Sequence, residues 1–182
     1  MTVTLNEAIA ALERFVGFRR GRLVSVSQRL QQAGIIPTGA PRTPPRLDLA
    51  HVVSLLVAYA ADAAIHLSAK SVEVFETLTP GGAELSTAPR HLQLTAGDQL
   101  RAIAALAAEG DGDMRKLRLE FVSSWPELAI HWPDGSVQRF REIGALASHW
   151  GNGGHRKSIT INGAALADAF GSLFGANSGV EP

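Results

Sequence analysis

The chain has 182 residues, of which 46% are hydrophobic and 19% are charged, and its formal net charge is zero. This length suits one compact domain or two small ones, and the apolar content excludes wholesale disorder. Cysteine is absent, which excludes disulfides, thiolate metal sites and a cysteine nucleophile.

The zero net charge hides an uneven distribution along the chain. Residues 1–50 contain seven arginines and three acidic residues, an excess of four positive charges. Residues 51–182 contain ten basic and fourteen acidic residues, the opposite excess. Because phosphate binding needs a local positive face whatever the overall charge, a nucleic-acid interface is expected near the N-terminus.

Helical spacing of apolar residues predicts two short helices in this basic part. The first starts from a cap at Thr4 or Asn6 and continues to about residue 16, where Gly17 breaks it. The second covers about residues 20–33, and Gly34 ends it as a left-handed C-cap residue.

The first residues carry no basic segment of the secretory type, so we expect a cytoplasmic protein.

Residues 9–28 fit a helix-turn-helix with Gly17 in the turn, because a glycine there lets two helices cross closely. Leu23 and Val26 take the inward positions of the second helix. The position four residues before the turn glycine, where the motif prefers a small side chain, holds Glu13. The alternative interpretation is an ordinary amphipathic helix whose arginines are only solvated.

The outward side of the second helix contains side chains that suit DNA. Arginine and glutamine reach guanine and adenine edges in the major groove, and serine suits phosphates and either base. The residues expected to face bases are Arg22, Ser25, Gln28, Arg29 and Gln32. The arginines expected to hold phosphates are Arg19, Arg20, Arg42 and Arg46, and Thr38 completes the DNA-binding set.

Residues 37–46 are rich in Pro, Gly, Thr and Arg and predict an extended arm. The arm has no apolar anchor, and it carries two arginines and no acid. In winged-helix proteins such a segment lies along the DNA backbone or enters the minor groove. It fits a proline-rich linker between helices equally well, and the two roles are compatible.

Further helices are predicted beyond the arm. Asp48 caps a strongly apolar helix over residues 49–66, which holds too many polar residues for a membrane span. Apolar residues nearly surround this helix, so we assign it either to the core or to an oligomer interface. Shorter helices are expected over about 69–78 and 95–109, the latter capped by Thr95.

After residue 114 the apolar period changes from that of helices to that of strands. The expected strands are 117–121, 128–132, 136–140 and 157–161, with a tight turn at 133–135, and the last helix is 163–174. The predicted fold class is therefore α+β. Its parts are a winged helix-turn-helix-like segment with a basic arm (1–46), a helical core or oligomerisation part (47–110), a small antiparallel β part with the final helix (114–174), and a tail (175–182).

No catalytic or metal-binding motif is expected. The Gly-x-Ser-x-Gly turn of serine hydrolases does not occur. His51 and His66 lie too far apart along one helix to share a metal ion. The sequence therefore favours a non-enzymatic protein that needs no cofactor and no metal.

The run RLQQAGIIPTG, followed by a basic loop and the apolar helix DLAHVVSLLVAYA, resembles small helix-turn-helix proteins of bacteriophages and prophages of the alphaproteobacterial type. The resemblance covers about residues 5–65, and its matched positions are Leu30, Ala33, Gly34, Ile35, Ile36 and Pro37. The loop of that family is richer in glycine, whereas this one is richer in proline. Small terminase subunits share a similar plan, with an N-terminal helix-turn-helix, oligomerising helices and a β-rich end.

The resemblance implies DNA binding, either in transcription control or in genome packaging. We expect a homo-oligomer that binds double-stranded DNA as a transcriptional regulator, with the β part contacting a protein partner. The alternatives are a DNA-packaging protein similar to a small terminase and a phage adaptor whose basic helix meets an acidic protein surface.

Overall fold

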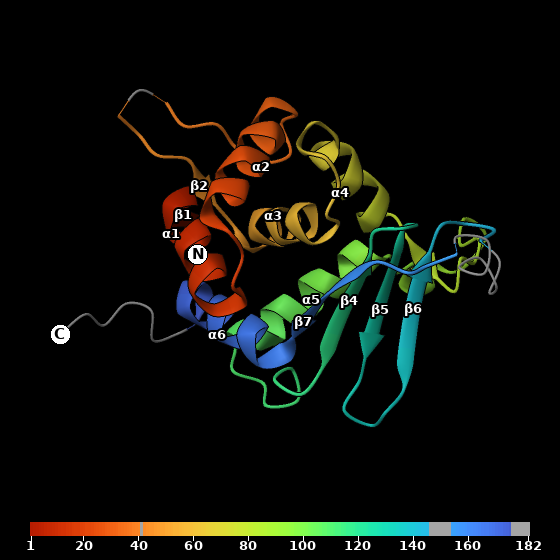
Figure 1. Ribbon diagram of the computed structural model, residues 1–182. Helices are drawn as coiled ribbons and strands as arrows, with labels where there is room; N and C mark the ends of the chain where they lie inside the picture. Colours follow the sequence, from red (N-terminus) through yellow and green to blue (C-terminus); the bar gives the residue numbers. More distant parts are fainter. Residues whose placement is uncertain (41, 146–153, 176–182) are drawn as a thin grey trace.

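The computed structural model describes residues 1–40, 42–145 and 154–175. These residues form helices and two antiparallel sheets, so the expected α+β class is confirmed. Figure 1 shows a group of helices beside a larger sheet, with the N-terminal and C-terminal helices close together. The expected tail lies outside the described residues from 176 onward.

The elements follow one another in two groups. The helical group consists of β1 (Val3–Thr4), α1 (Leu5–Ala11), the π-helical turn η1 (Leu12–Val16), α2 (Arg20–Gln32), β2 (Arg46–Leu47), α3 (Leu49–Ala60), the 3₁₀ turn η2 (Ile65–Leu67) and α4 (Ser68–Glu76). The sheet group consists of β3 (Thr79–Pro80), the 3₁₀ turn η3 (Arg90–Leu92), α5 (Ala96–Ala108), β4 (Arg118–Val122), β5 (Glu127–His131), β6 (Val137–Arg141), β7 (Ser158–Asn162) and α6 (Gly163–Phe174).

Reciprocal capping boxes begin three of the helices, at the cap residues that the sequence predicted. In each case the cap side chain accepts from a backbone N–H three residues later, and that later side chain accepts from the cap's own N–H. The pairs are Thr4 with Glu7, Asp48 with His51, and Thr95 with Asp98. The predicted left-handed conformation of Gly34 is confirmed by its φ of 72°, and Gly17, where the first helix was expected to break, has a φ of 79°.

Two of the predicted helix boundaries are wrong. The apolar helix expected to reach residue 66 ends at Ala60, and Asp62 has a φ of 50°, which no α-helix accommodates. The helix expected over about residues 69–78 covers Ser68–Glu76 instead, and its first residue, Ser68, is fully buried and makes no cap hydrogen bond. In both places tertiary contacts outweigh the local apolar period.

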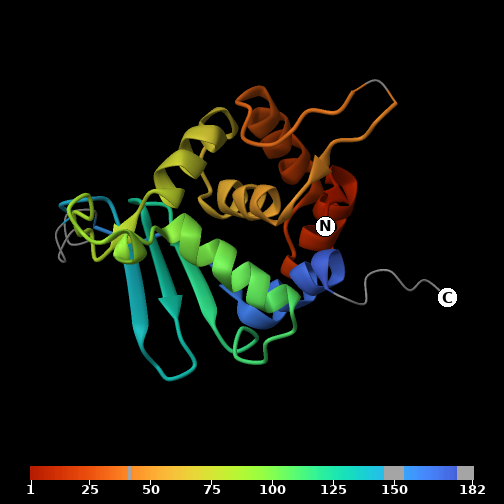
Figure 2. The same ribbon diagram turned by 180° about the vertical axis from the view of Figure 1, so that it is seen from behind.

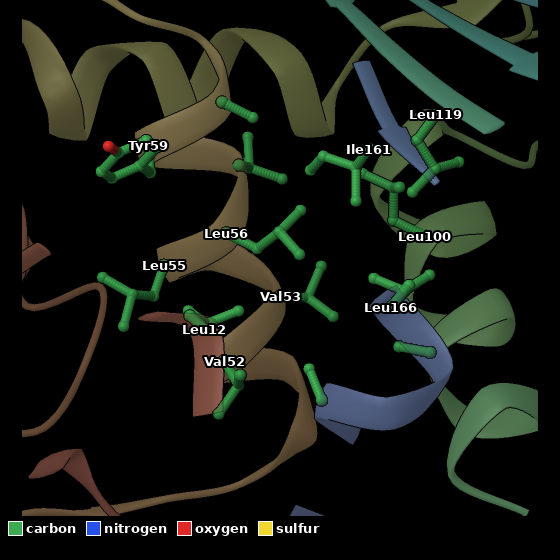
Figure 3. Close-up of a cluster of buried hydrophobic side chains, with 14 of the residues drawn as sticks. Leu12, Val52, Val53, Leu55, Leu56, Tyr59, Leu100, Leu119, Ile161 and Leu166 are labelled. Carbon is green, nitrogen blue, oxygen red and sulfur yellow. The ribbon is translucent and has the colours of Figure 1, made fainter. Parts of the chain in front are cut away.

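Helix α3 is the centre of the hydrophobic core. Every residue from Val52 to Ala60 is buried, so no face of this stretch is left for a second copy of the chain. Figure 3 shows Leu55 and Leu56 pointing in different directions from α3, with Leu56 and Val53 on the side of α5 and α6. Of the two roles considered for this helix, the structure supports the core. No helix within the described ranges is long and apolar enough to cross a membrane.

The larger sheet has the strand order β3-β6-β5-β4-β7, and all its neighbours are antiparallel. The β5–β6 hairpin turns at residues 132–136, which confirms the expected tight turn. In both views α5 lies between α3 and this sheet (Figures 1 and 2). Helix α6 contacts α5, η1 and α1, so the last helix packs against the first and the expected parts share one core.

Replacing Leu56 with Ala is expected to destabilise the fold by about 2–5 kcal/mol, because the large-to-small change opens a cavity at the centre of the core. Leu56 is 1% exposed and meets Leu100, Leu119 and Leu166 around a small void. Leu106→Ala, at a position 39% exposed on α5, is the matched control and should cost less than about 1 kcal/mol. Urea denaturation measures both, and equal losses would contradict the central place of α3.

Candidate nucleic-acid interface

The turn between η1 and α2 is fastened to the end of α3. Gly17 provides the left-handed residue, and Phe18 after it is buried with its ring stacked on Tyr59, at 3.9 Å between ring centroids. The Tyr59 hydroxyl accepts a hydrogen bond from the backbone N–H of Arg19 at 2.9 Å. The start of α2 is therefore held at a fixed position against the core.

Helix α2 separates its residues as the sequence predicted. Leu23, Val26 and Leu30 are fully buried against the core. The opposite side exposes Gln28, Arg29 and Gln32, and Arg29 Nη1 donates to Gln32 Oε1 at 2.9 Å. Ser25 is half-buried beside them, with its hydroxyl donating to the backbone carbonyl of Gly21. Four of the five residues expected to face bases therefore share one side of the helix.

Arg22 is the exception, because its guanidinium has partners within the fold. Its Nη2 donates to the carbonyl of Ala63 at 2.7 Å and lies 3.3 Å from the Asp62 carboxylate. Its guanidinium also sits 5.5 Å from the centroid of the Tyr59 ring. Arg22 thus satisfies the polar groups exposed where α3 ends. The sequence could not reveal this role, because Arg22 and Asp62 are forty residues apart.

The two arginines at the start of α2 differ in their partners. Arg20 forms an exposed ion pair with Glu13 at 3.2 Å, whereas Arg19 is exposed and has no carboxylate partner among the described residues. Glu13 occupies the position where a small residue was expected, yet it is exposed and points at Arg20 instead of into the helix crossing. The departure from the motif therefore causes no packing conflict.

The arm between α2 and α3 is a narrow loop that both views show projecting from the body (Figures 1 and 2). Ala40 and Thr43 exchange backbone hydrogen bonds of 3.1 and 2.9 Å near its tip. The base is held by the pairing of β1 with β2 and by a bond from Leu5 N–H to the Pro45 carbonyl. The β1–β2 pairing was not predicted, because each strand has only two residues.

The expected arm residues lie at different distances from the tip. Thr38 and Arg42 are exposed in the projecting part, and Arg42 has a φ of 63°. Arg46 is exposed in β2, at the base, where it is paired in register with Thr4. Within the described part of the chain, neither arginine forms an ion pair. Pro41, which belongs to the predicted arm, lies outside the described residues.

No protein-family model matches the chain, and no curated protein and no solved structure matches it. The described residues contain no group of three or more histidine and acidic side chains that could hold a metal ion.

A second polar cluster, on the outer face of the larger sheet, was not predicted. Glu127 is only 2% exposed, and its carboxylate accepts from Arg139 at 2.6 Å, from Arg141 at 2.8 Å and from Arg156 at 3.1 Å. Arg156 also donates to Glu120 at 3.1 Å. The alternation along β4, β5 and β6 indicated an outward polar face, but it could not show which charges meet.

The arginines in this cluster determine the protonation state of Glu127. Burial acts to raise its pKa, but the hydrogen bonds from Arg141 and Arg139 and the positive charges of Arg141 and Arg156 outweigh this, so the pKa is lowered from 4.5. Glu127 is therefore ionised at neutral pH. Its charge neutralises arginines that would otherwise repel one another on the sheet.

Arg22→Ala should lower stability by about 1–3 kcal/mol, because it leaves the Ala63 carbonyl without its donor and removes one of the two cations beside Asp62, at a half-buried site. Arg29→Ala removes the same charge from the exposed side of α2 and should stay within about 0.5 kcal/mol of the natural chain. Denaturant unfolding followed by circular dichroism compares the two. A neutral Arg22→Ala would mean that Arg22 is free for ligands.

Glu127→Gln should be destabilising at neutral pH, by about 1.5–3 kcal/mol, because hydrogen bonds to an ionised group are lost. A carboxylate whose pKa is lower in the folded state than in the unfolded state stabilises the fold fully when the pH is above its unfolded-state pKa. This stabilisation disappears as the pH falls through the folded-state pKa. The difference in unfolding free energy between the natural chain and Glu127→Gln should therefore shrink below pH 4.5. Urea titrations at several pH values measure it, with exposed Glu109→Gln as the control. A difference that persists at low pH would contradict the ion-pair origin.

Proposed function

We propose that the protein binds double-stranded DNA without catalysing a reaction, with α1, Gly17 and α2 acting as a helix-turn-helix and the arm as a wing. The observation that carries the proposal is the polar side of α2, with Gln28, Arg29 and Gln32 exposed, next to a projecting arm that presents Arg42. Arginine and glutamine on one exposed helix side suit base edges in the major groove.

The short β1–β2 sheet supports this reading of the arm. Val3 pairs with Leu47 and Thr4 with Arg46, so the arm leaves the body beside the helix pair at a fixed angle. With Tyr59 holding the start of α2, the helix and the arm are both positioned by the core. A rigid pair of this kind can contact the major groove and the neighbouring backbone together.

The backbone of Arg42 supports a role for its side chain. A φ of 63° disfavours any residue with a Cβ, and glycine would adopt it without strain. The presence of arginine at this position supports a role in which its positive charge, near the tip of the arm, contacts a phosphate or enters the minor groove. Arg19 and Arg29 have no acidic partner among the described residues, so their charge is available to the same ligand.

The charge available in one copy is modest, so a single copy should bind DNA weakly. We therefore propose a homo-oligomer, in which two α2 helices meet successive grooves of one duplex, and a cytoplasmic transcriptional regulator as its role. Since α3 is occupied by the core, the contact between copies must use another surface.

The second candidate is a phage packaging or adaptor protein that uses a protein partner. The observation in its favour is the outer sheet face, where Arg139, Arg141 and Arg156 surround two glutamates and leave one positive charge in excess. An acidic protein segment is the complementary partner for such a face.

Arg29→Ala combined with Arg42→Ala should weaken binding to mixed-sequence duplex DNA by at least about tenfold at low salt, because two cations are removed from the proposed interface. The slope of log affinity against log salt should fall by about 2. Electrophoretic mobility shift over a salt series measures both quantities.

The matched control is Arg90→Ala combined with Arg118→Ala, which removes two exposed positive charges far from α2. This control should bind DNA much as the natural chain does. Equal losses in the two double variants would contradict the site assignment. Absence of any binding by the natural chain at micromolar concentration would favour the adaptor function.

A further inference from the structure

A hollow of about 480 Å³ lies where the first helix, the base of the arm and the last helix meet. Its volume falls in the range of small-molecule sites, roughly 300–1,000 Å³. Apolar side chains contribute to its lining, among them Val3 and Ala11, each 6% exposed, and Leu173, 5% exposed. Both ends of the described chain therefore contribute to one concave surface.

Two arginines from different elements also line the hollow. Arg14 comes from η1, with its guanidinium 5.1 Å from the centroid of the Phe15 ring, and Arg46 comes from β2. Both are exposed, and neither forms an ion pair within the described ranges. Two guanidinium groups that line one hollow together with apolar side chains suit an anionic ligand that also has an apolar part.

The acid that lines the hollow, Glu7, is already engaged. Its carboxylate accepts from the backbone N–H of Thr4 at 2.6 Å and from the Thr4 hydroxyl at 2.8 Å. These two hydrogen bonds, with a smaller contribution from the charge of Arg46, hold the pKa of Glu7 below 4.5. Among the side chains that line the hollow, the two arginines therefore outnumber the one ionised carboxylate.

We propose that this hollow binds a small monocarboxylate with an apolar ring or chain, whose carboxylate lies between Arg14 and Arg46 and whose apolar part covers Val3, Ala11 and Leu173. The apolar floor adds affinity for a ligand that brings its own apolar surface.

Occupancy of the hollow would act on the arm. Arg46 is in β2, so a carboxylate bound to it ties the base of the arm to α1 and α6. The same guanidinium is then withdrawn from the DNA backbone. The bound ligand therefore lowers the affinity of the protein for DNA. This regulatory effect rests on the proposed function, whereas the binding of the ligand does not.

The test is a calorimetric titration of the full chain with 4-phenylbutyrate, and with the uncharged 4-phenylbutyramide as the matched ligand. The acid should bind the natural chain and should bind Arg14→Ala or Arg46→Ala at least about tenfold more weakly, since a charge-assisted hydrogen bond is lost. Ala10→Phe, which places a ring in the hollow from an exposed position on α1, should block binding equally. Arg90→Ala, far from the hollow, should bind normally.

Equal binding of the acid and the amide, or no binding of either, overturns the proposal. Tighter binding of inorganic phosphate than of 4-phenylbutyrate overturns the ligand class. A mobility shift with and without the acid tests the effect on DNA, and an unchanged affinity for DNA overturns the regulatory part. Ligand binding by a chain that never shifts DNA supports the hollow and contradicts the proposed function, so the two failures are distinguishable.

Discussion

Burial of α3 from its second turn onward is the constraint on which the other elements depend. A helix buried on every side from Val52 to Ala60 needs cover all around, and no single neighbour can provide it. Helices α2, α4 and α5 contact it directly, and Val53 and Leu56 reach towards α6 and the inner face of the sheet. Segments that are distant in the chain therefore pack around this one apolar helix. The last helix packs against the first because both cover the same core.

The end of α3 decides where the surrounding charges go. Asp62, with its φ of 50°, turns the chain out of the helix and presents a carboxylate that Arg22 and Lys157 both meet. One acidic residue thus joins α2 to the segment that precedes β7. This junction explains why the arginines of α2 differ in their surroundings: Arg22 makes contacts within the fold, whereas Arg29 is exposed.

The surface that remains after these requirements is asymmetric. The N-terminal side presents the polar side of α2, the projecting arm and the hollow at its base, and these are joined through β1 and β2. The far side presents the outer sheet face, where buried Glu127 organises three arginines. One scaffold joins these two faces, so the proposed DNA contact on one side would be connected to the proposed protein contact on the other.

Local chemistry alone determined the starts of α1, α3 and α5, the left-handed Gly34, the tight turn of the β5–β6 hairpin and the sorted sides of α2, because caps, turns and apolar periods depend on residues a few positions apart. The same local signals placed Gln28, Arg29, Gln32 and Arg42 on the surface correctly. Only the tertiary structure decided that α3 ends at Ala60, that Arg22 turns inward, that two-residue strands hold the arm, and that Arg14 and Arg46 line one hollow. Each of these features depends on contacts between residues far apart in the chain. Packing of the core determines which of these residues meet, and such contacts produce no periodic pattern in the sequence.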